Sequence, residues 1–384
     1  MRVAHIITRL IVGGAQENTV ASTLGMHERH DVDAYLISGP TSGPEGSLES
    51  QFDAHPDRLT VIPELVRPVR PLVDWGALRR LARLLRENPP DIVHTHSGKA
   101  GILGRMAARR AGIRTIVHTI HGPSFGAFQG AAANFAFRAA ERHAGRFTTH
   151  FVTVANAMRD QYLAAGIGVP EKYTRIFSGF NLKPFLDAGD DPRLREQLGL
   201  NKDDFVIGKI ARLFELKGHD DLLAVAPELV RANPRIKFLF VGDGEWRSKF
   251  ERKIEELGIR SHVVFAGLVP PADVPRYVGV MNALAHLSRR EGLPRALPQA
   301  MAASKPVVAF DCDGAGEVCV DGETGILLRS GDLAGLTKNL VELASDPARC
   351  DSLGSAGQSF VRKRFSVERM VDELHKLYLD LLRA

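Results

Sequence analysis

Short apolar runs rich in β-branched residues alternate with helical patterns along most of this chain, and the alternation strongly constrains its fold. The first series of predicted strands comprises residues 3–7, 33–38, 91–96, 115–121 and 150–155. The second series comprises residues 205–211, 237–242, 262–267, 283–287 and 306–310. Continuous apolar runs of this kind are typical of strands buried on both faces. The pattern therefore predicts an α/β protein in which helices cover both faces of parallel sheets.

The rhythm breaks between residues 180 and 204, where Asp, Pro and Gly are frequent and no strand pattern occurs. The 384 residues also exceed what one hydrophobic core usually serves. We therefore predict two doubly wound, Rossmann-like domains, over residues 1–183 and 184–365, joined by a linker in this region. Ligands of open parallel sheets bind beyond the carboxyl ends of the strands. Two such domains would face one another across a cleft, with these strand-end loops lining it.

The composition, with 44% hydrophobic and 25% charged residues, is that of an ordinary globular protein. The three cysteines, Cys312, Cys319 and Cys350, cannot form a disulfide framework and lack C-x-x-C spacing, which favours a reducing, cytoplasmic setting. The first ten residues are too short and too soon interrupted for a signal peptide. No stretch approaches the roughly 18 apolar residues of a membrane span. We expect a cytoplasmic protein that is at most peripheral on the inner face of a membrane.

The net charge of +5 is spread unevenly. Residues 1–183 contain 22 Lys and Arg against 15 Asp and Glu, whereas the remainder contains 28 against 30. A basic first half beside a near-neutral second half suggests that only the first half meets something anionic. The alternative is a basic face that is simply solvated. A nucleic-acid partner is not indicated, because no basic strand carries interleaved aromatic residues.

A Gly13-Gly14 pair follows the first predicted strand and precedes a helical pattern. Small residues at the start of a helix let backbone N–H groups approach an anion. The pair matches neither G-x-G-x-x-G nor G-x-x-x-x-G-K-[ST], so neither a dinucleotide fingerprint nor a P-loop is present. A plain tight turn is the alternative interpretation.

Four histidines lie on two predicted strands of the first half or directly after them. His121 begins a loop after the strand at 115–121, where it could sense or transfer a proton. We expect His118 to lie in the domain interior instead. His94 and His96 are two residues apart and could share one face of a strand, but no nearby acid or cysteine completes a metal site. We therefore predict no metal site.

Two cations follow the first strand of the second series, in the sequence KIARLFELKGHDDL. Arg212 and Lys217 fall in the loop between that strand and a helix that we expect to start near Gly218. A planar guanidinium and a compact ammonium at a strand end suit a diphosphate. Surface cations are also common in loops without any ligand.

The segment SRREGLPRALPQAM, residues 288–301, joins a buried strand to a helix. Pro298 lacks an N–H, and in a helix interior its ring would clash with the preceding turn. Within the first turn that N–H has no intrahelical partner anyway. The helix should therefore start between about Pro294 and Leu297, with its free N–H groups and positive dipole end facing the ligand side.

Glu291 lies in the loop just before that helix, beside Gly292. A carboxylate near exposed N–H groups suits a polyhydroxylated ligand, because it accepts hydrogen bonds from hydroxyls while the N–H groups donate. Gln299, in the opening turns, could reach another part of the same ligand. The alternative is a solvent loop in which Arg289 or Arg290 forms a salt bridge with Glu291.

The order of these motifs resembles that of retaining, family 4 glycosyltransferases of the GT-B fold. The matching features are the Gly-Gly pair, the His-Gly after a mid-domain strand, R-x-x-x-x-K, E-G-L-P, A-M-A-x-x-K-P-V-V-A and GEVCVDGETGILL. The resemblance covers nearly the whole chain and is strongest to bacterial enzymes that build capsule, exopolysaccharide or other envelope glycans. It implies that residues 366–384 form a C-terminal helix crossing back to the first domain.

The resemblance also implies roles for individual positions. The residues that it assigns to the reaction are His121, Glu291, Arg212 and Lys217. The residues that it assigns to the nucleotide-sugar donor are Gly13, Gly14, Arg212, Lys217, Glu291, Gly292, Leu293, Pro294 and Gln299. Arg212 and Lys217 would neutralise the diphosphate leaving group, and Glu291 would bind sugar hydroxyls as a binding group rather than a nucleophile. No metal or other cofactor is implied, because these cations and the helix start supply the positive charge.

Position 299 is where this sequence departs from the family, which commonly has a Glu there that holds the nucleotide ribose. A Glu accepts from both ribose hydroxyls, whereas Gln accepts one and donates with its other arm. Such a change typically costs about 1 kcal/mol, and it removes no catalytic group. We therefore expect an active enzyme. A sugar-nucleotide epimerase and a non-catalytic sugar-nucleotide-binding protein are the alternatives.

The expected donor is a UDP-sugar, and the expected acceptor is a glycan or a polyprenyl-linked glycan. The predicted helix Trp75–Glu87 bears on the acceptor, since its arginines lie away from its leucines. These arginines are Arg79, Arg80, Arg83 and Arg86. A basic amphipathic helix can rest on anionic lipid, although its ordinary role is to pack on a core with a solvated basic side. With the basic first half, it suggests an anionic membrane surface as a partner.

Overall fold

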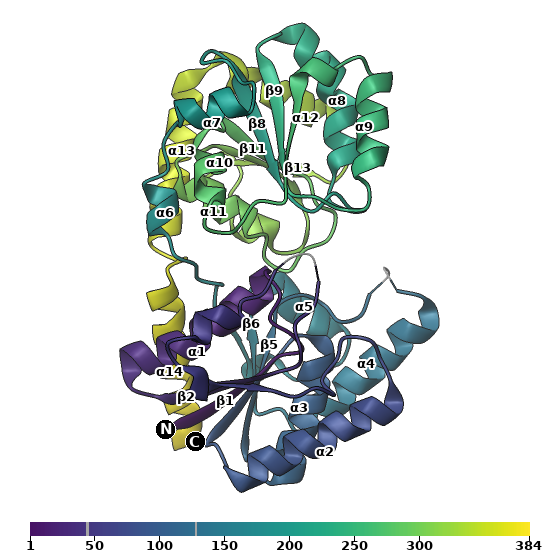
Figure 1. Cartoon of the computed structure of the whole chain (residues 1–384), viewed down its shortest axis with the longest axis vertical. Coiled ribbons are helices and arrows are strands. Elements are labelled where there is room, and N and C mark those ends of the chain that lie inside the picture. Colours follow the sequence, from purple (N-terminus) through teal and green to yellow (C-terminus); the bar gives the residue numbers. More distant parts are fainter. Residues whose placement is uncertain (44–45, 127–128) are drawn as a thin grey trace. The chain divides into compact units, whose positions relative to one another are not determined.

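The computed structural model describes residues 1–43, 46–126 and 129–384, and its chain forms two compact units (Figure 1). Unit 1 comprises Met1–Phe180 together with Ser366–Ala384, and unit 2 comprises Asn181–Phe365. The C-terminal helix thus belongs to unit 1, although it follows unit 2 in the sequence. The described residues include no helix with the length and hydropathy that a membrane span requires.

Within its described residues, unit 1 is built on a seven-stranded, wholly parallel sheet of order β3-β2-β1-β4-β5-β6-β7. Its strands are β1 Arg2–Ile6, β2 Asp33–Ser38, β3 Leu59–Val61, β4 Ile92–His96, β5 Thr115–Ile120, β6 His150–Thr153 and β7 Tyr173–Arg175. The strand order reverses between β1 and β4. This point is the topological switch at which α/β sheets commonly bind their ligands.

Helices join and cover the strands of unit 1. They are α1 Gly14–His30, α2 Pro71–Glu87, α3 Gly98–Ala111, α4 Ala131–Gly145, α5 Asn156–Ala164 and α14 Val367–Arg383. Helix α2 begins four residues before the predicted Trp75, because Pro71 is accommodated in its first turn. Helix α14, yellow in Figure 1, packs along α1. Its buried Met370, Val371, Leu374 and Tyr378 complete a core cluster with residues of the sheet.

Every residue of unit 2 is described. Its six-stranded parallel sheet has the order β10-β9-β8-β11-β12-β13. Its strands are β8 Phe205–Ile210, β9 Ile236–Val241, β10 Val263–Gly267, β11 Ala283–His286, β12 Val307–Asp311 and β13 Ile326–Arg329. Its helices are α6 Lys183–Leu186, α7 Pro192–Gln197, α8 His219–Ala232, α9 Arg247–Glu256, α10 Val274–Gly279, α11 Ala296–Ala302, α12 Leu333–Ser345 and α13 Pro347–Arg362. The switch in strand order lies between β8 and β11.

The predicted α/β class with two doubly wound domains is confirmed, and every predicted strand occurs with ends shifted by at most two residues. Three further strands, β3, β7 and β13, were not predicted. Each has three or four residues and lies at the edge of its sheet, so it carries too short a pattern to be recognised. The segment 180–204, which has no strand pattern, contains the short helices α6 and α7.

A fully buried ion pair joins α3 to α4 in unit 1. Nη2 of Arg105 donates to Oε2 of Glu141 at 2.5 Å, and neither side chain is exposed. Oε1 of Glu141 accepts from the Ser124 hydroxyl at 2.9 Å. Ser124 follows His121 by three residues, so the buried pair also holds the chain just after β5.

Glu141→Ala should lower the free energy of unfolding by about 3–5 kcal/mol, because it leaves the Arg105 guanidinium buried without its counter-charge. Urea denaturation of the two proteins measures the difference. The double substitution Arg105→Met with Glu141→Leu is the control, and it should cost much less since no charge stays buried. A loss below about 1 kcal/mol for Glu141→Ala would contradict this account.

Candidate active site

The loop after β8 carries Lys217 and is held against the end of β11 by a close backbone contact. Gly218 caps α8 in the left-handed conformation, with φ of 71°. A Cβ at this position would lie 2.0 Å from the backbone oxygen of Leu287, so only glycine fits. The N–H of Arg289 also donates to the oxygen of Leu216 at 2.8 Å. Two strand-end loops of unit 2 are thereby fixed side by side, and α8 starts where the sequence predicted.

Lys217 and Glu291 form an ion pair between these two loops. Nζ of Lys217 donates to Oε1 of Glu291 at 2.6 Å, and the side chains are 23% and 17% exposed. Nε2 of His286, on β11, lies 3.5 Å from the same carboxylate oxygen. Burial alone would raise the pKa of Glu291, but His286 and the Lys217 ammonium outweigh it and hold the pKa well below its usual range. Glu291 is therefore an ionised acceptor at neutral pH.

The backbone around Glu291 is fixed by the loop after β12. The N–H of Glu291 donates to Oδ2 of Asp313 at 2.7 Å, and the backbone oxygen of Gly292 accepts from the N–H of Gly314 at 3.1 Å. Leu293 and Pro294 are buried behind it. The backbone of both Glu291 and Gly292 is thus held by hydrogen bonds to the loop after β12.

Helix α11 begins at Ala296, inside the interval that Pro298 predicted. Gln299 is half-buried on this helix, and its N–H donates to the oxygen of Arg295 at 3.2 Å. Arg212 is exposed at the end of β8, with its guanidinium carbon 5.7 Å from the centre of the Phe214 ring. Arg212 therefore lies in the same strand-end loop as Lys217, and Gln299 lies on the helix that follows the Glu291 loop.

The alternative in which Arg289 neutralises Glu291 is wrong. Nη2 of Arg289 instead donates to Oδ1 of Asp221 at 2.6 Å, and its Nε lies 3.3 Å from the other carboxylate oxygen. Asp221 is in the first turn of α8, where an acid is favoured by the helix dipole. Arg289 thus ties the Glu291 loop to α8, whereas Lys217 pairs directly with the Glu291 carboxylate. Burial lowers the pKa of Arg290, and Asp313 and Glu291 oppose this effect. A salt bridge from Arg290 to Glu291 stays a prediction.

Lys209, on β8, is a residue of this region that sequence reasoning missed. Its side chain is buried, and burial lowers its pKa to about 7. The nearby Lys217 acts in the same direction, whereas Asp221 and Glu291 oppose it. The only sequence signal was a lysine inside the otherwise apolar strand FVIGKI. This buried amine is a further titratable group beside Lys217, Glu291 and His286.

In unit 1, the predicted Gly13-Gly14 pair lies at the start of α1. Gly13 caps the helix and Gly14 is its first residue, and both are half-buried. The oxygen of Gly13 accepts from the N–H of Glu17 at 2.9 Å. A Cβ on Gly13 would lie 2.9 Å from Oε1 of Gln16, so a larger residue would displace that side chain.

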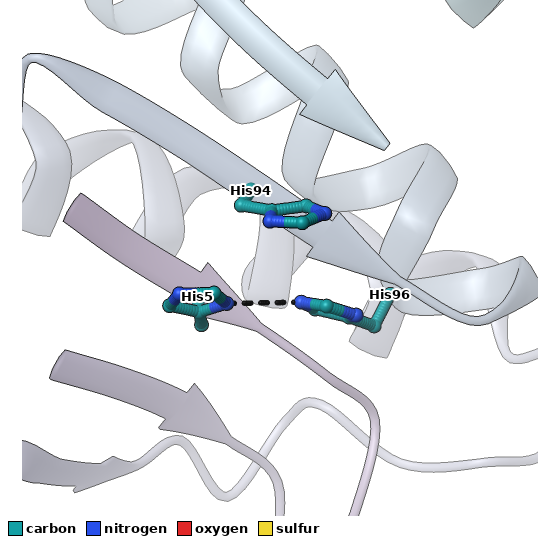
Figure 2. A group of neighbouring side chains, drawn as sticks. All are labelled: His5, His94 and His96. Atoms are coloured by element: carbon teal, nitrogen blue, oxygen red, sulfur yellow. Dashed lines mark hydrogen bonds between the residues drawn. The ribbon is translucent and has the colours of Figure 1, made fainter. Parts of the chain in front are cut away.

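The histidines of unit 1 extend from the sheet interior to the loop after β5. His118 is buried with Nδ1 2.9 Å from Oγ1 of Thr95, which confirms the interior position predicted for it. His121 is half-buried at the end of β5, with Nε2 3.1 Å from Nδ1 of His96. His94 and His96 share one face of β4, with ring centres 4.4 Å apart. His5 of β1, which sequence reasoning left out, lies beside them (Figure 2).

Comparison with known proteins identifies the family. Residues 190–360 match the family model "Glycosyl transferases group 1", and residues 12–183 match "Glycosyltransferase Family 4". The putative glycosyltransferase EpsD of Bacillus subtilis (strain 168) is 30% identical over 309 residues, which cover 78% of this chain and 79% of that protein. The chain belongs to glycosyltransferase family 4. The family predicted from its motifs is therefore confirmed.

Two further proteins resemble this glycosyltransferase over its whole length. An Escherichia coli enzyme, UDP-Gal:alpha-D-GlcNAc-diphosphoundecaprenol alpha-1,3-galactosyltransferase, is 25% identical, covering 100% of this chain and 97% of the enzyme. The crystal structure of Anabaena Alr3699/HepE in complex with UDP superimposes with a TM-score of 0.83 and 22% identity. That match covers 99% of this chain and 100% of the other, and it supports the GT-B fold.

The buried Lys209 of this glycosyltransferase should make its stability depend on pH in alkaline solution. Between about pH 7 and 10.5, the unfolded chain holds a proton on Lys209 that the folded chain has lost. The free energy of unfolding should therefore gain a contribution that rises with pH across this window. Lys209→Met should remove that contribution, whereas Met at the exposed Lys202 should retain it. Urea denaturation at several pH values measures both slopes, and equal slopes for wild type and Lys209→Met would contradict the assignment.

Proposed function

We propose that this glycosyltransferase is a retaining, metal-independent hexosyltransferase that uses a UDP-sugar. Its acceptor is a glycan or lipid-linked glycan of cell-envelope polysaccharide synthesis. The observation that carries the proposal is the ion pair of Lys217 and Glu291, which brings a cation and an ionised acceptor together at the strand ends of unit 2. The names of similar proteins support the donor and the acceptor, since they include a UDP-galactose enzyme acting on a diphosphoundecaprenol-linked sugar and a structure containing UDP-glucose.

Lys217 and Arg212 are the residues proposed to bind the donor diphosphate. The ammonium is a compact point charge, and the exposed guanidinium can bind two phosphate oxygens at once. Glu291 accepts hydrogen bonds from sugar hydroxyls, helped by the backbone at Gly292, Leu293 and Pro294. Gln299 meets the ribose, and His121 and the Gly13-Gly14 turn meet the transferred sugar. These assignments place a cation at the leaving group and an anion at the neutral, hydroxyl-rich sugar.

In the proposed reaction the bond between the anomeric carbon and the phosphate oxygen breaks, and its electron pair stays on the diphosphate. Lys217 and Arg212 offset the charge that develops there, so no divalent metal is needed. The acceptor hydroxyl attacks the same face of the sugar, and its proton passes to the departing phosphate oxygen. Glu291 binds the sugar and forms no covalent intermediate, because its carboxylate is engaged by Lys217 and its low pKa makes it a weak nucleophile.

Two alternative functions differ from sugar transfer in what happens to a UDP-sugar. A sugar-nucleotide epimerase requires paired acid and base residues, and it would isomerise a UDP-sugar without any acceptor. A non-catalytic binder is suggested by Gln299 alone, and it would hold the nucleotide tightly without hydrolysing or transferring the sugar. Incubating the protein with UDP-sugars, with and without acceptor, separates the three functions by the product formed.

Glu291→Ala and Lys217→Ala should each reduce sugar transfer by about a hundredfold or more, because each removes a charged group beside the reacting sugar or its leaving group. Release of UDP from a UDP-sugar measures transfer, and circular dichroism and thermal unfolding check the fold. Lys202→Ala, an exposed lysine of the same unit, is the control. EDTA should leave every rate unchanged. Full activity in either site variant would exclude this site, and a strict metal requirement would exclude the metal-independent reaction.

Exposed apolar residues beside basic ones support a membrane-bound acceptor. Leu72 is 86% exposed and Trp75 is 56% exposed at the start of α2, and Val69 just before the helix is 65% exposed. The guanidinium carbon of Arg79 lies 4.5 Å from the centre of the Trp75 ring. The four arginines predicted to lie away from the leucines are all exposed. Apolar side chains among arginines are typical of a surface that meets anionic lipid.

Helix α4 of unit 1 has a similar composition. Phe135 is 75% exposed, and it lines a shallow concave surface with Arg138, Arg142 and Arg146. We propose that α2 and α4 together hold the protein on an anionic bilayer, where a polyprenyl-linked acceptor would be located. Each arginine near such a surface contributes about 1 kcal/mol of attraction, which salt screens.

Flotation with phosphatidylglycerol-containing vesicles at low salt should carry the wild-type protein upward, and added salt should weaken the association. Leu72→Ser with Trp75→Ser should reduce binding by about tenfold or more, because it removes the apolar contacts. Val169→Ser is the matched control, since Val169 is an exposed apolar residue elsewhere in unit 1. Absence of wild-type binding at low salt, or equal loss in the control, would remove the support for this surface.

A further inference from the structure

Three histidines of unit 1 are linked into a chain through their ring nitrogens, in the order His5, His96 and His121. Nδ1 of His5 lies 3.0 Å from Nε2 of His96, the contact drawn as a dashed line in Figure 2. Nδ1 of His96 lies 3.1 Å from Nε2 of His121. The three rings come from β1, β4 and the end of β5, which are neighbours in the sheet. Both distances are those of ordinary hydrogen bonds between nitrogens.

The two inner rings of this chain are neutral. Burial lowers the pKa of His5 to about 3, and burial together with the surrounding histidines lowers the pKa of His96 well below its usual value. A neutral imidazole has one N–H donor and one acceptor nitrogen. His96 bonds through both nitrogens, so it must donate to one neighbour and accept from the other. The hydrogen bonds of the chain therefore all run in one direction.

The inner end of the chain indicates which direction that is. Nε2 of His5 is buried and has no hydrogen-bond partner in the described part of the chain. If the bonds ran from His121 toward His5, this nitrogen would carry an N–H buried without an acceptor. Orphaned buried N–H groups are rare in folded proteins. In the opposite direction His5 carries its proton on Nδ1, donates to His96, and leaves only a lone pair unpaired.

We propose that His96 is a positioning residue that, together with His5, sets the tautomer of His121. His96 donates from Nδ1 to Nε2 of His121, so neutral His121 carries its own proton on Nδ1. The hydrogen bond also fixes the orientation of the His121 ring at the end of β5. The inference deepens the proposed function, since it takes His121 as the residue that meets the transferred sugar and specifies Nδ1 as the protonated nitrogen of its ring.

A bound metal is the competing explanation for the same cluster. One ring nitrogen from each of His5, His94 and His96 lies within 4.8 Å of the others, and three such ligands are typical of zinc sites. Both nitrogens of His94 are engaged, however, since Nδ1 contacts the hydroxyl of Tyr378 and Nε2 lies 2.6 Å from Oγ1 of Thr119. A metal would have to displace one of these contacts. The geometry therefore favours hydrogen-bonded, neutral rings.

Long-range proton–nitrogen NMR spectra of the full-length protein with ¹⁵N-labelled histidine report the tautomer of each ring. His121→Gln assigns the His121 signals by their loss. The expected result in wild type is a protonated Nδ1 and an unprotonated Nε2 for His121. His96→Phe keeps the ring volume but removes both hydrogen bonds, so His121 should revert to the Nε2–H form that free histidine prefers. His5→Phe provides a second variant in case His96→Phe does not fold, and it should loosen the tautomer preference.

His150→Gln is the control. His150 is also on a strand of unit 1, but its hydrogen bond is to Thr174 rather than to one of the three linked histidines. Its spectrum should keep the wild-type tautomer of His121. A protonated Nε2 on His121 in wild type, or a tautomer that neither His96→Phe nor His5→Phe changes, would overturn the proposal. So would stoichiometric zinc in the purified protein, measured by elemental analysis.

A kinetic measurement separates this inference from the proposed function. His96→Phe should lower kcat for sugar transfer about tenfold with KM for the donor unchanged, as expected for the loss of one orienting hydrogen bond. If wild type shows the expected tautomer but transfers no sugar, the proposed function is wrong and the tautomer assignment of His121 is supported. If sugar transfer is normal and His121 carries its proton on Nε2, the tautomer assignment is wrong and the proposed function is supported.

Discussion

The contact between Lys217 and Glu291 is the interaction on which the candidate site depends. The two residues are separated by 74 positions, and only the close approach of the loops after β8 and β11 brings them to 2.6 Å. That approach requires Gly218, whose missing side chain lets the backbone contact Leu287. His286 and the Lys217 ammonium then keep Glu291 charged although its carboxylate is largely buried. The proposed binding of a sugar linked to a diphosphate is based on this arrangement of a charged acceptor beside a cation.

The strand ends of the two units differ in charge. Unit 2 concentrates charge, since Lys209, Lys217 and Arg289 lie among the carboxylates of Asp221 and Glu291. Unit 1 places neutral groups at the corresponding switch point, because burial keeps the inner histidines uncharged and their hydrogen bonds give the cluster its order. Charged groups suit a diphosphate, whereas neutral donors and acceptors suit hydroxyl groups. The switch point of unit 2 is thus charged, whereas that of unit 1 is lined by neutral hydrogen-bonding groups.

Much of the fold was predictable because buried strands carry long β-branched runs. Pro298 alone restricted the start of α11 to the interval from about Pro294 to Leu297, and the helix begins within it, at Ala296. The edge strands β3, β7 and β13 were not, since three or four residues carry too little pattern. Lys217 and Glu291 were both singled out, but their pairing depends on tertiary packing between distant loops. A single polar residue inside an apolar strand, such as His5 or Lys209, is a weak signal that does not show what the side chain contacts. Their roles could be recognised only once their neighbours were known.

Titration calorimetry with UDP tests most directly whether unit 2 binds a nucleoside diphosphate through the loop after β8. Wild-type protein should bind UDP without added metal, and Lys217→Ala should weaken the affinity by about ten- to a hundredfold, as expected for a charge-assisted hydrogen bond. Lys202→Ala should bind as wild type does. An affinity for UDP that Lys217→Ala leaves unchanged would contradict the account.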